Sequence, residues 1–98
     1  MNGFAPTPQH GAALRWVLTH FDVGNCSTPE ILKEAHAFAH RISTWAAAQP
    51  EQHVRAVYAW AVTSFLKDCE ERAKVFDNSR RVMAAFEDLP KPPDDIVA

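Results

Sequence analysis

Two histidines in the stretch EAHAFAH, at positions 34–40, are the residues whose type and spacing most clearly suggest chemistry. His36 and His40 are four residues apart, so a helix would place both imidazoles on one side, where they could bind a single metal ion. The glutamate that follows the first histidine of an HExxH metal site is absent. A third ligand is also needed, and antiparallel pairing of the first two helices would bring His10 level with His40. A metal site at these three histidines is therefore an alternative interpretation, and no cofactor is expected.

The helix that carries these histidines is predicted to turn them away from the core. Phe38 and Ile42 lie on the side opposite both imidazoles, and apolar residues at this spacing mark the buried face of a helix. The outer side also carries small residues at Ala37, Ser43 and Ala47, which would let another helix approach closely. This outer side is interpreted as a docking surface or a pH-sensitive contact, because imidazole titrates near neutral pH. A solvated face is the alternative, because alanine is the best helix former.

The two thiols of the chain belong to Cys26 and Cys69. Antiparallel packing of two helices around Pro50 would bring these cysteines near one another. Cys69 falls on an apolar stripe, which favours an inert buried thiol over a redox pair or a nucleophile, and no histidine on the core stripes is placed to activate it. Two cysteines are too few for a disulfide framework, so we expect a cytoplasmic protein with reduced thiols.

The most basic neighbourhood of the chain consists of Arg72, Lys74, Arg80 and Arg81. These side chains could contact nucleic acid, which makes a nucleic-acid-binding regulator a second alternative. The formal net charge of −2 argues against a protein whose main task is to bind phosphate backbones. No glycine-rich phosphate loop and no zinc-finger spacing is present. Nucleic acid is therefore not the expected partner.

The sequence favours neither catalysis nor membrane insertion. No nucleophile, base and oxyanion donor can be placed together, so an enzyme is not expected. No apolar run approaches the roughly 20 residues of a membrane span. The first residues also lack the positively charged segment and apolar run of a secretory signal. We therefore expect no membrane partner.

Clear start and stop signals delimit the helices that must position these residues. The first helix is predicted to begin at Thr7-Pro8, an N-cap followed by a first-turn proline, and to end before Gly24. The second begins within residues 27–30, where Ser-Thr-Pro-Glu offers a capping box, and ends before Pro50. The third begins at Pro50 and continues to the Asp-Asn-Ser sequence at 77–79.

The last periodic segment, residues 79–89, is predicted as a short fourth helix or as an extension of the third. No sustained alternation of apolar and polar residues indicates a strand. The fold class is therefore all-α: a small antiparallel bundle of three main helices plus a short C-terminal helix or helical extension. Residues 1–6 are expected to be flexible, residues 7–89 to form a single helical domain, and residues 90–98 to form a proline-rich, acidic tail.

Two tryptophans do not fit the apolar stripes of their helices. Trp60 falls opposite the stripe of the third helix, and Trp16 falls off the stripe of the first. One interpretation is that the segment with Val82, Met83 and Phe86 folds back and covers one of them. The other is that at least one tryptophan belongs to a partner surface, because Trp is enriched at the energetic centres of interfaces. The first helix favours the second interpretation, since its apolar residues spread nearly all round and require neighbours on every side.

These observations lead to the hypothesis of a non-enzymatic protein–protein interaction module, such as a small adaptor, inhibitor or regulatory protein. It would dock an exposed helix face onto another protein or onto a second copy of itself, and a homodimer is expected. The face would be centred on Trp60 or Trp16, or on the strip that contains His36, His40 and Ala47. The small size and simple build suggest an accessory protein of a bacterium or phage.

Overall fold

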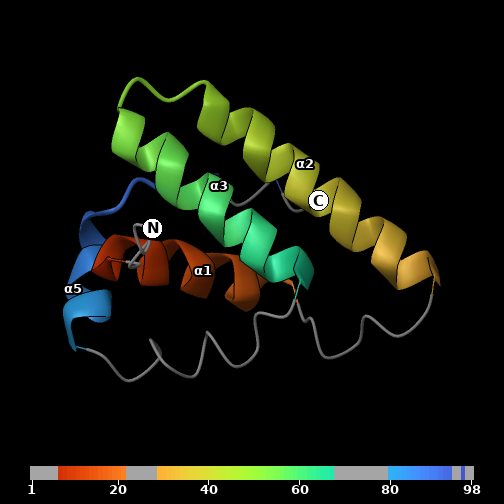
Figure 1. Cartoon of the computed structure of the whole chain (residues 1–98), viewed down its shortest axis with the longest axis horizontal. Helices are drawn as coiled ribbons and strands as arrows, with labels where there is room; N and C mark the ends of the chain where they lie inside the picture. The colour runs from red at the N-terminus through yellow and green to blue at the C-terminus, as the bar shows by residue number, and fades with distance from the viewer. Residues whose placement is uncertain (1–6, 22–28, 68–79, 94–95, 97–98) are drawn as a thin grey trace, which may run out of the picture.

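The protein is an all-α bundle. The computed structural model describes residues 7–21, 29–67, 80–93 and 96, and these residues contain no strand. The helices of the described part are α1 (Pro8–His20), α2 (Pro29–Ala47), α3 (Gln52–Lys67) and α5 (Arg80–Asp88), shown in Figure 1. The predicted fold class is confirmed.

The start of α1 follows the local signal in the sequence. Thr7 is the N-cap, and its hydroxyl oxygen accepts a hydrogen bond from the His10 backbone N–H at 3.4 Å. In return the Thr7 backbone N–H donates to Nδ1 of His10 at 3.0 Å, which completes a capping box. Pro8 occupies the first turn, where its missing N–H costs nothing. The helix ends at His20 because Phe21 adopts an extended conformation.

The turn around Pro50 separates α2 from α3, as predicted. The end of α2 tightens, with hydrogen bonds from the Ala48 N–H to the Trp45 carbonyl (3.1 Å) and from the Gln49 N–H to the Ala46 carbonyl (3.0 Å). The third helix begins at Gln52, two residues later than predicted. The start signal within residues 27–30 and the predicted continuation to residue 77 lie largely outside the described residues.

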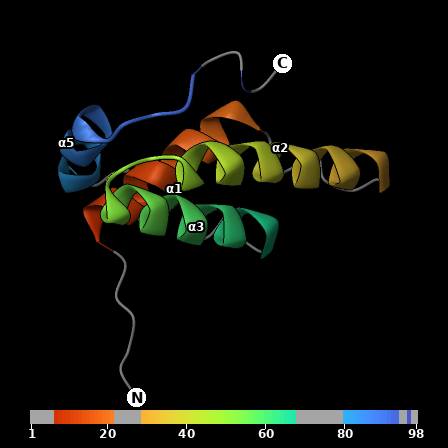
Figure 2. The ribbon, with the colours of Figure 1, turned by 90° about the horizontal axis from the view of Figure 1, so that it is seen from above.

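Helices α2 and α3 lie side by side and run antiparallel, with α1 against α3 and α5 against α1. Figures 1 and 2 both place α5 at the end of the bundle where α3 begins, far from the last residue of α3. Residues 80–88 are therefore a separate helix, and the alternative of a continuous extension of the third helix is wrong. Tertiary packing explains this separation, because α5 buries its apolar side against α1.

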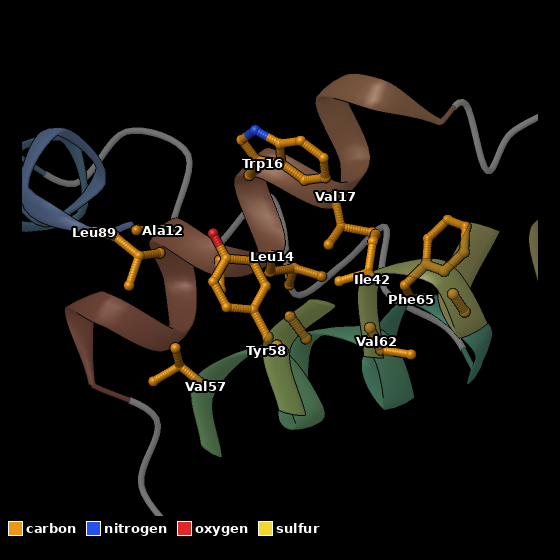
Figure 3. Packing of buried hydrophobic residues seen from close by; sticks show 14 of the residues in the cluster. Ala12, Leu14, Trp16, Val17, Ile42, Val57, Tyr58, Val62, Phe65 and Leu89 are labelled. Atoms are coloured by element: carbon orange, nitrogen blue, oxygen red, sulfur yellow. The ribbon is translucent and has the colours of Figure 1, made fainter. Parts of the chain in front are cut away.

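The core lies where α1, α2 and α3 meet (Figure 3). Its largest fully buried side chains are Leu14, Val17, Phe38, Ile42, Val54, Tyr58, Phe65, Val82 and Leu89. Phe38 stacks on Phe21 with ring centroids 5.3 Å apart and meets Phe65 edge-on at 5.9 Å. Burial of each such side chain stabilises the fold by about 1.5–3 kcal/mol.

Other helices of the same chain surround α1, and this corrects the prediction made for Trp16. Trp16 is only 2% exposed and stacks on His20 at 3.9 Å between ring centroids. The Phe38 ring of α2 lies parallel to the indole at 6.3 Å. The prediction that Trp16 stands off the core as a partner-binding residue is wrong, because α2, α3 and α5 supply the neighbours that the all-round apolar pattern of α1 requires.

The segment after α5 packs along the bundle. Leu89 and Pro92 are buried, and the Tyr58 hydroxyl donates a hydrogen bond to the Pro90 carbonyl at 2.8 Å. Further along, Nε of Arg41 donates to the carbonyl of Ile96 at 2.7 Å. The described part of the predicted tail is thus attached to the helices, and packing continues past residue 89.

The model also bears on membrane insertion. Within the described ranges, every helix falls short of the length or the hydropathy that crossing a bilayer requires.

Candidate protein-interaction surface

A hollow opens between α2 and α3 close to the turn that joins them. Its volume is about 220 Å³, and it is lined by Ser43, Ala46, Ala47, Arg55 and Ala59. We call it the α2–α3 hollow. Ser43, Ala47 and Ala59 are exposed, so the hollow is accessible from solvent.

Helical spacing explains why small residues gather at this place. Ser43 and Ala47 are four residues apart on α2, and Arg55 and Ala59 are four apart on α3, so each pair shares one side of its helix. Because the helices run antiparallel, these two sides face each other across the groove between them. Side chains as short as alanine and serine leave the groove unfilled. The hollow therefore results from the small residues at positions 43, 46, 47 and 59.

Arg55 sets the electrostatic character of the rim. Its Nη1 donates a hydrogen bond to the Gln49 carbonyl at 2.5 Å, where a cation also interacts favourably with the C-terminal end of α2. The Gln49 side chain in turn donates to the Trp45 carbonyl at 3.1 Å. Among the described residues no carboxylate pairs with this guanidinium, so further N–H donors of Arg55 remain available at the hollow.

The histidines of the EAHAFAH stretch are exposed, as predicted. His36 lies seven residues before Ser43, and therefore two turns along the same side of α2. Leu32 lies one turn further back and is 46% exposed. An exposed row, defined by Leu32, His36, Ser43 and Ala47, therefore runs along α2 and ends in the hollow.

The structure does not assemble the alternative metal site. Nδ1 of His10 contacts the Thr7 backbone N–H and hydroxyl, and its ring meets Trp60 edge-on at 5.4 Å between centroids. His10 is only 9% exposed, whereas His36 and His40 lie on the exposed side of α2. Among the described residues no three His, Cys, Asp or Glu side chains are grouped to hold an ion. The predicted level pairing of His10 with His40 fails because α1 places His10 against α3.

Trp60 is half-buried, and part of its cover comes from an unexpected source. The fourth helical segment was expected to cover one of the two tryptophans, and α5 packs on α1, the helix that carries Trp16. Among the described residues, the ring of His10, at the first turn of α1, meets the Trp60 ring. Trp60 is thus partly integrated into the bundle, and the hollow lies on the other side of α3.

The basic neighbourhood is only partly described. Arg80 and Arg81 are exposed on the first turn of α5. Arg72 and Lys74 lie outside the described residues, as do both cysteines, Cys26 and Cys69.

Sequence reasoning missed Arg55 and Ala59. The signal that could have found them was present: antiparallel pairing around Pro50 places the first two turns of α3, with Arg55 and Ala59, opposite the last two turns of α2, with Ser43 and Ala47. The small residues of α2 are visible in a projection of that helix alone, but their partners across the groove depend on the register of α3.

Comparison with known proteins gives no functional lead: no protein-family model, no curated protein and no solved structure matches the chain.

Proposed function

We propose that the protein is a non-enzymatic interaction module that binds another protein through the groove between α2 and α3. The observation that carries this proposal is the solvent-accessible hollow of about 220 Å³ at Ser43, Ala47 and Ala59. A cavity of about 150 Å³ holds a benzene ring, so the hollow has room for one large apolar side chain of a partner. Burial of such a side chain contributes about 1.5–3 kcal/mol to binding.

The residues of the hollow suit binding better than catalysis. Its lining offers one hydroxyl, at Ser43, and one cation, at Arg55. In the part of the chain that the structure describes, no hydrogen bond joins Ser43 to a histidine or a carboxylate that could activate it as a nucleophile. The remaining lining consists of alanines, which allow a partner helix to approach closely.

Site-specific photo-crosslinking in the cells that make the protein tests this proposal. A photo-reactive amino acid at position 47 is expected to give one discrete cross-linked product, and the same amino acid at Ala84, an exposed alanine on α5, is expected to give none. Ala59→Leu, which fills the hollow from the other helix, should abolish the product at position 47. Equal products from both positions, or no product at either, would contradict the proposal.

The mass of the product identifies the class of partner. A product of twice the chain mass would indicate the homodimer expected from the sequence, and any other mass a different protein. Cytoplasmic location and bacterial or phage origin stay predictions.

A further inference from the structure

The surface around the hollow carries an excess of basic side chains. Helix α3 contains no aspartate or glutamate along its whole length. Arg55 lines the hollow, and on α2 the exposed Lys33 lies three residues before His36 and seven before His40, so it shares their outward side. These groups contribute positive charge to the face.

The carboxylates of α2 point elsewhere. Glu34 precedes Arg41 by seven residues, and Glu30 precedes Glu34 by four, so all three lie on one side of the helix. That side is where Arg41 binds the carbonyl of Ile96. Glu51, just before α3, is exposed, but Arg55 directs its guanidinium to the Gln49 carbonyl. Among the described residues, the guanidinium of Arg55 thus has no carboxylate bound to it.

The shape of the groove indicates the secondary structure of the partner segment that it can bind. The backbone N–H and C=O groups within α2 and α3 are bonded inside each helix, so the face offers no free edge to which a strand could add. A groove between two antiparallel helices, lined by alanines, instead accepts the side-chain ridge of a third helix. The row from Leu32 to Ala47 extends over four turns of α2, which matches the contact length of such a helix.

Two other occupants fit less well. A second copy docked by a two-fold axis would bring two surfaces of the same positive sign together, which is repulsive. A nucleic acid would gain from the positive charge but would leave Leu32 and the apolar hollow unused.

We infer that the partner, on the binding role proposed above, is an acidic amphipathic helix of a different protein, with one large apolar side chain in the α2–α3 hollow and a carboxylate on Arg55.

Selection from a peptide library tests this inference on the intact protein. The library would consist of helix-forming peptides with one randomised face, displayed on phage and selected against the purified chain. Selected peptides are expected to be rich in aspartate and glutamate around one Leu, Phe or Trp. Their affinity for the chain should fall as salt is raised, because exposed ion pairs are screened.

Variants of the chain locate the peptide site. Ala47→Trp, which occupies the hollow, should weaken binding of a selected peptide by about tenfold or more, and Arg55→Gln by about fivefold. The matched controls Ala84→Trp and Arg80→Gln, both exposed on α5, should leave the affinity unchanged. Thermal unfolding of each variant shows that it folds, and Ala59→Leu provides a second way to fill the hollow.

The inference is overturned if no peptide is selected, if selected peptides are neutral or basic, or if they bind Ala47→Trp as well as the parent. Competition by duplex DNA would point to nucleic acid instead, and a two-fold dimer that Ala47→Trp dissociates would point to a second copy. Cross-linking at position 47 depends on neither the charge nor the helicity of the partner. If cross-linking succeeds but one of these contrary results is obtained, only the inference about the partner is wrong and the proposed function stands. If no cross-linked product forms at position 47, the proposed function is wrong as well.

Discussion

His10 takes the part in the α1 capping box that glutamate or glutamine usually takes. Its Nδ1 accepts a hydrogen bond from the Thr7 backbone N–H, which is the role of a neutral imidazole. Burial lowers the pKa of His10 below its usual value of 6.5. Protonation would remove the acceptor and place a positive charge at the N-terminal end of a helix, where it is unfavourable.

Acid is therefore expected to destabilise the protein through His10. The unfolded chain binds this proton more readily than the folded one, so the free energy of unfolding contributed by His10 is fully present above about pH 6.5 and falls as the pH drops toward the lower folded-state pKa. His10→Gln keeps a capping acceptor at the same position but does not titrate. Urea unfolding between about pH 7.5 and 5 should show a smaller loss of stability in His10→Gln than in the parent. An identical pH dependence in both proteins would contradict the role assigned to His10.

At the scale of the elements, α5 is held by the packing of one of its sides against α1. Val82 is 1% exposed, whereas its neighbour Met83 is 43% exposed. Lys91 fastens the end of the helix: its Nζ donates to the carbonyls of Phe86 at 2.5 Å and Leu89 at 3.0 Å and lies 4.7 Å from the centre of the Phe86 ring. These contacts satisfy C-terminal carbonyls of α5 that the helix itself leaves open.

A pair of substitutions on adjacent residues tests this orientation of α5. Val82→Ala should lower the free energy of unfolding by about 1–2 kcal/mol, because it leaves a cavity against α1. Met83→Ala should change it by less than about 0.5 kcal/mol, because the side chain is largely in solvent. Chemical denaturation of both variants measures the difference. Equal effects would mean that α5 does not present Val82 to α1 as described.

Local sequence signals predicted the helix boundaries well. They did not predict features that depend on how the helices pack against one another. Thr7-Pro8 and Pro50 fixed the start of α1 and the turn between α2 and α3, because caps and prolines act within one turn of backbone. The burial of Trp16 depends on three other helices, and a single-helix projection contains none of them. The outward placement of His36 and His40 was predictable from Phe38, but the hollow required the register of α2 against α3.

At the scale of the whole molecule, Tyr58 connects α3 with the segment that follows α5. Its hydroxyl binds the Pro90 carbonyl, 32 residues further along the chain, and its ring meets Trp45 edge-on at 5.3 Å. Burial raises the pKa of Tyr58, so the phenol stays protonated and able to donate under ordinary conditions.

Removal of this hydroxyl should loosen the segment without disturbing the core. Tyr58→Phe is expected to lower the free energy of unfolding by about 0.5–1.5 kcal/mol, the usual net value of one hydrogen bond. Hydrogen exchange should show faster exchange in the segment around Leu89 and Lys91, with little change in α2. Unchanged stability and unchanged exchange rates would show that this hydrogen bond does not stabilise the segment.

The enclosure of α1 also has a consequence for the order in which the protein folds. The first helix contacts the last described helix, and the two are separated by about 60 residues of chain, which is a long separation for a helical protein. During synthesis, the apolar sides of α1 that α5 covers stay unprotected until residues 80–88 have left the ribosome. Completion of the bundle is therefore expected to wait for the C-terminal helix, and a chain interrupted before residue 80 should expose an aggregation-prone first helix.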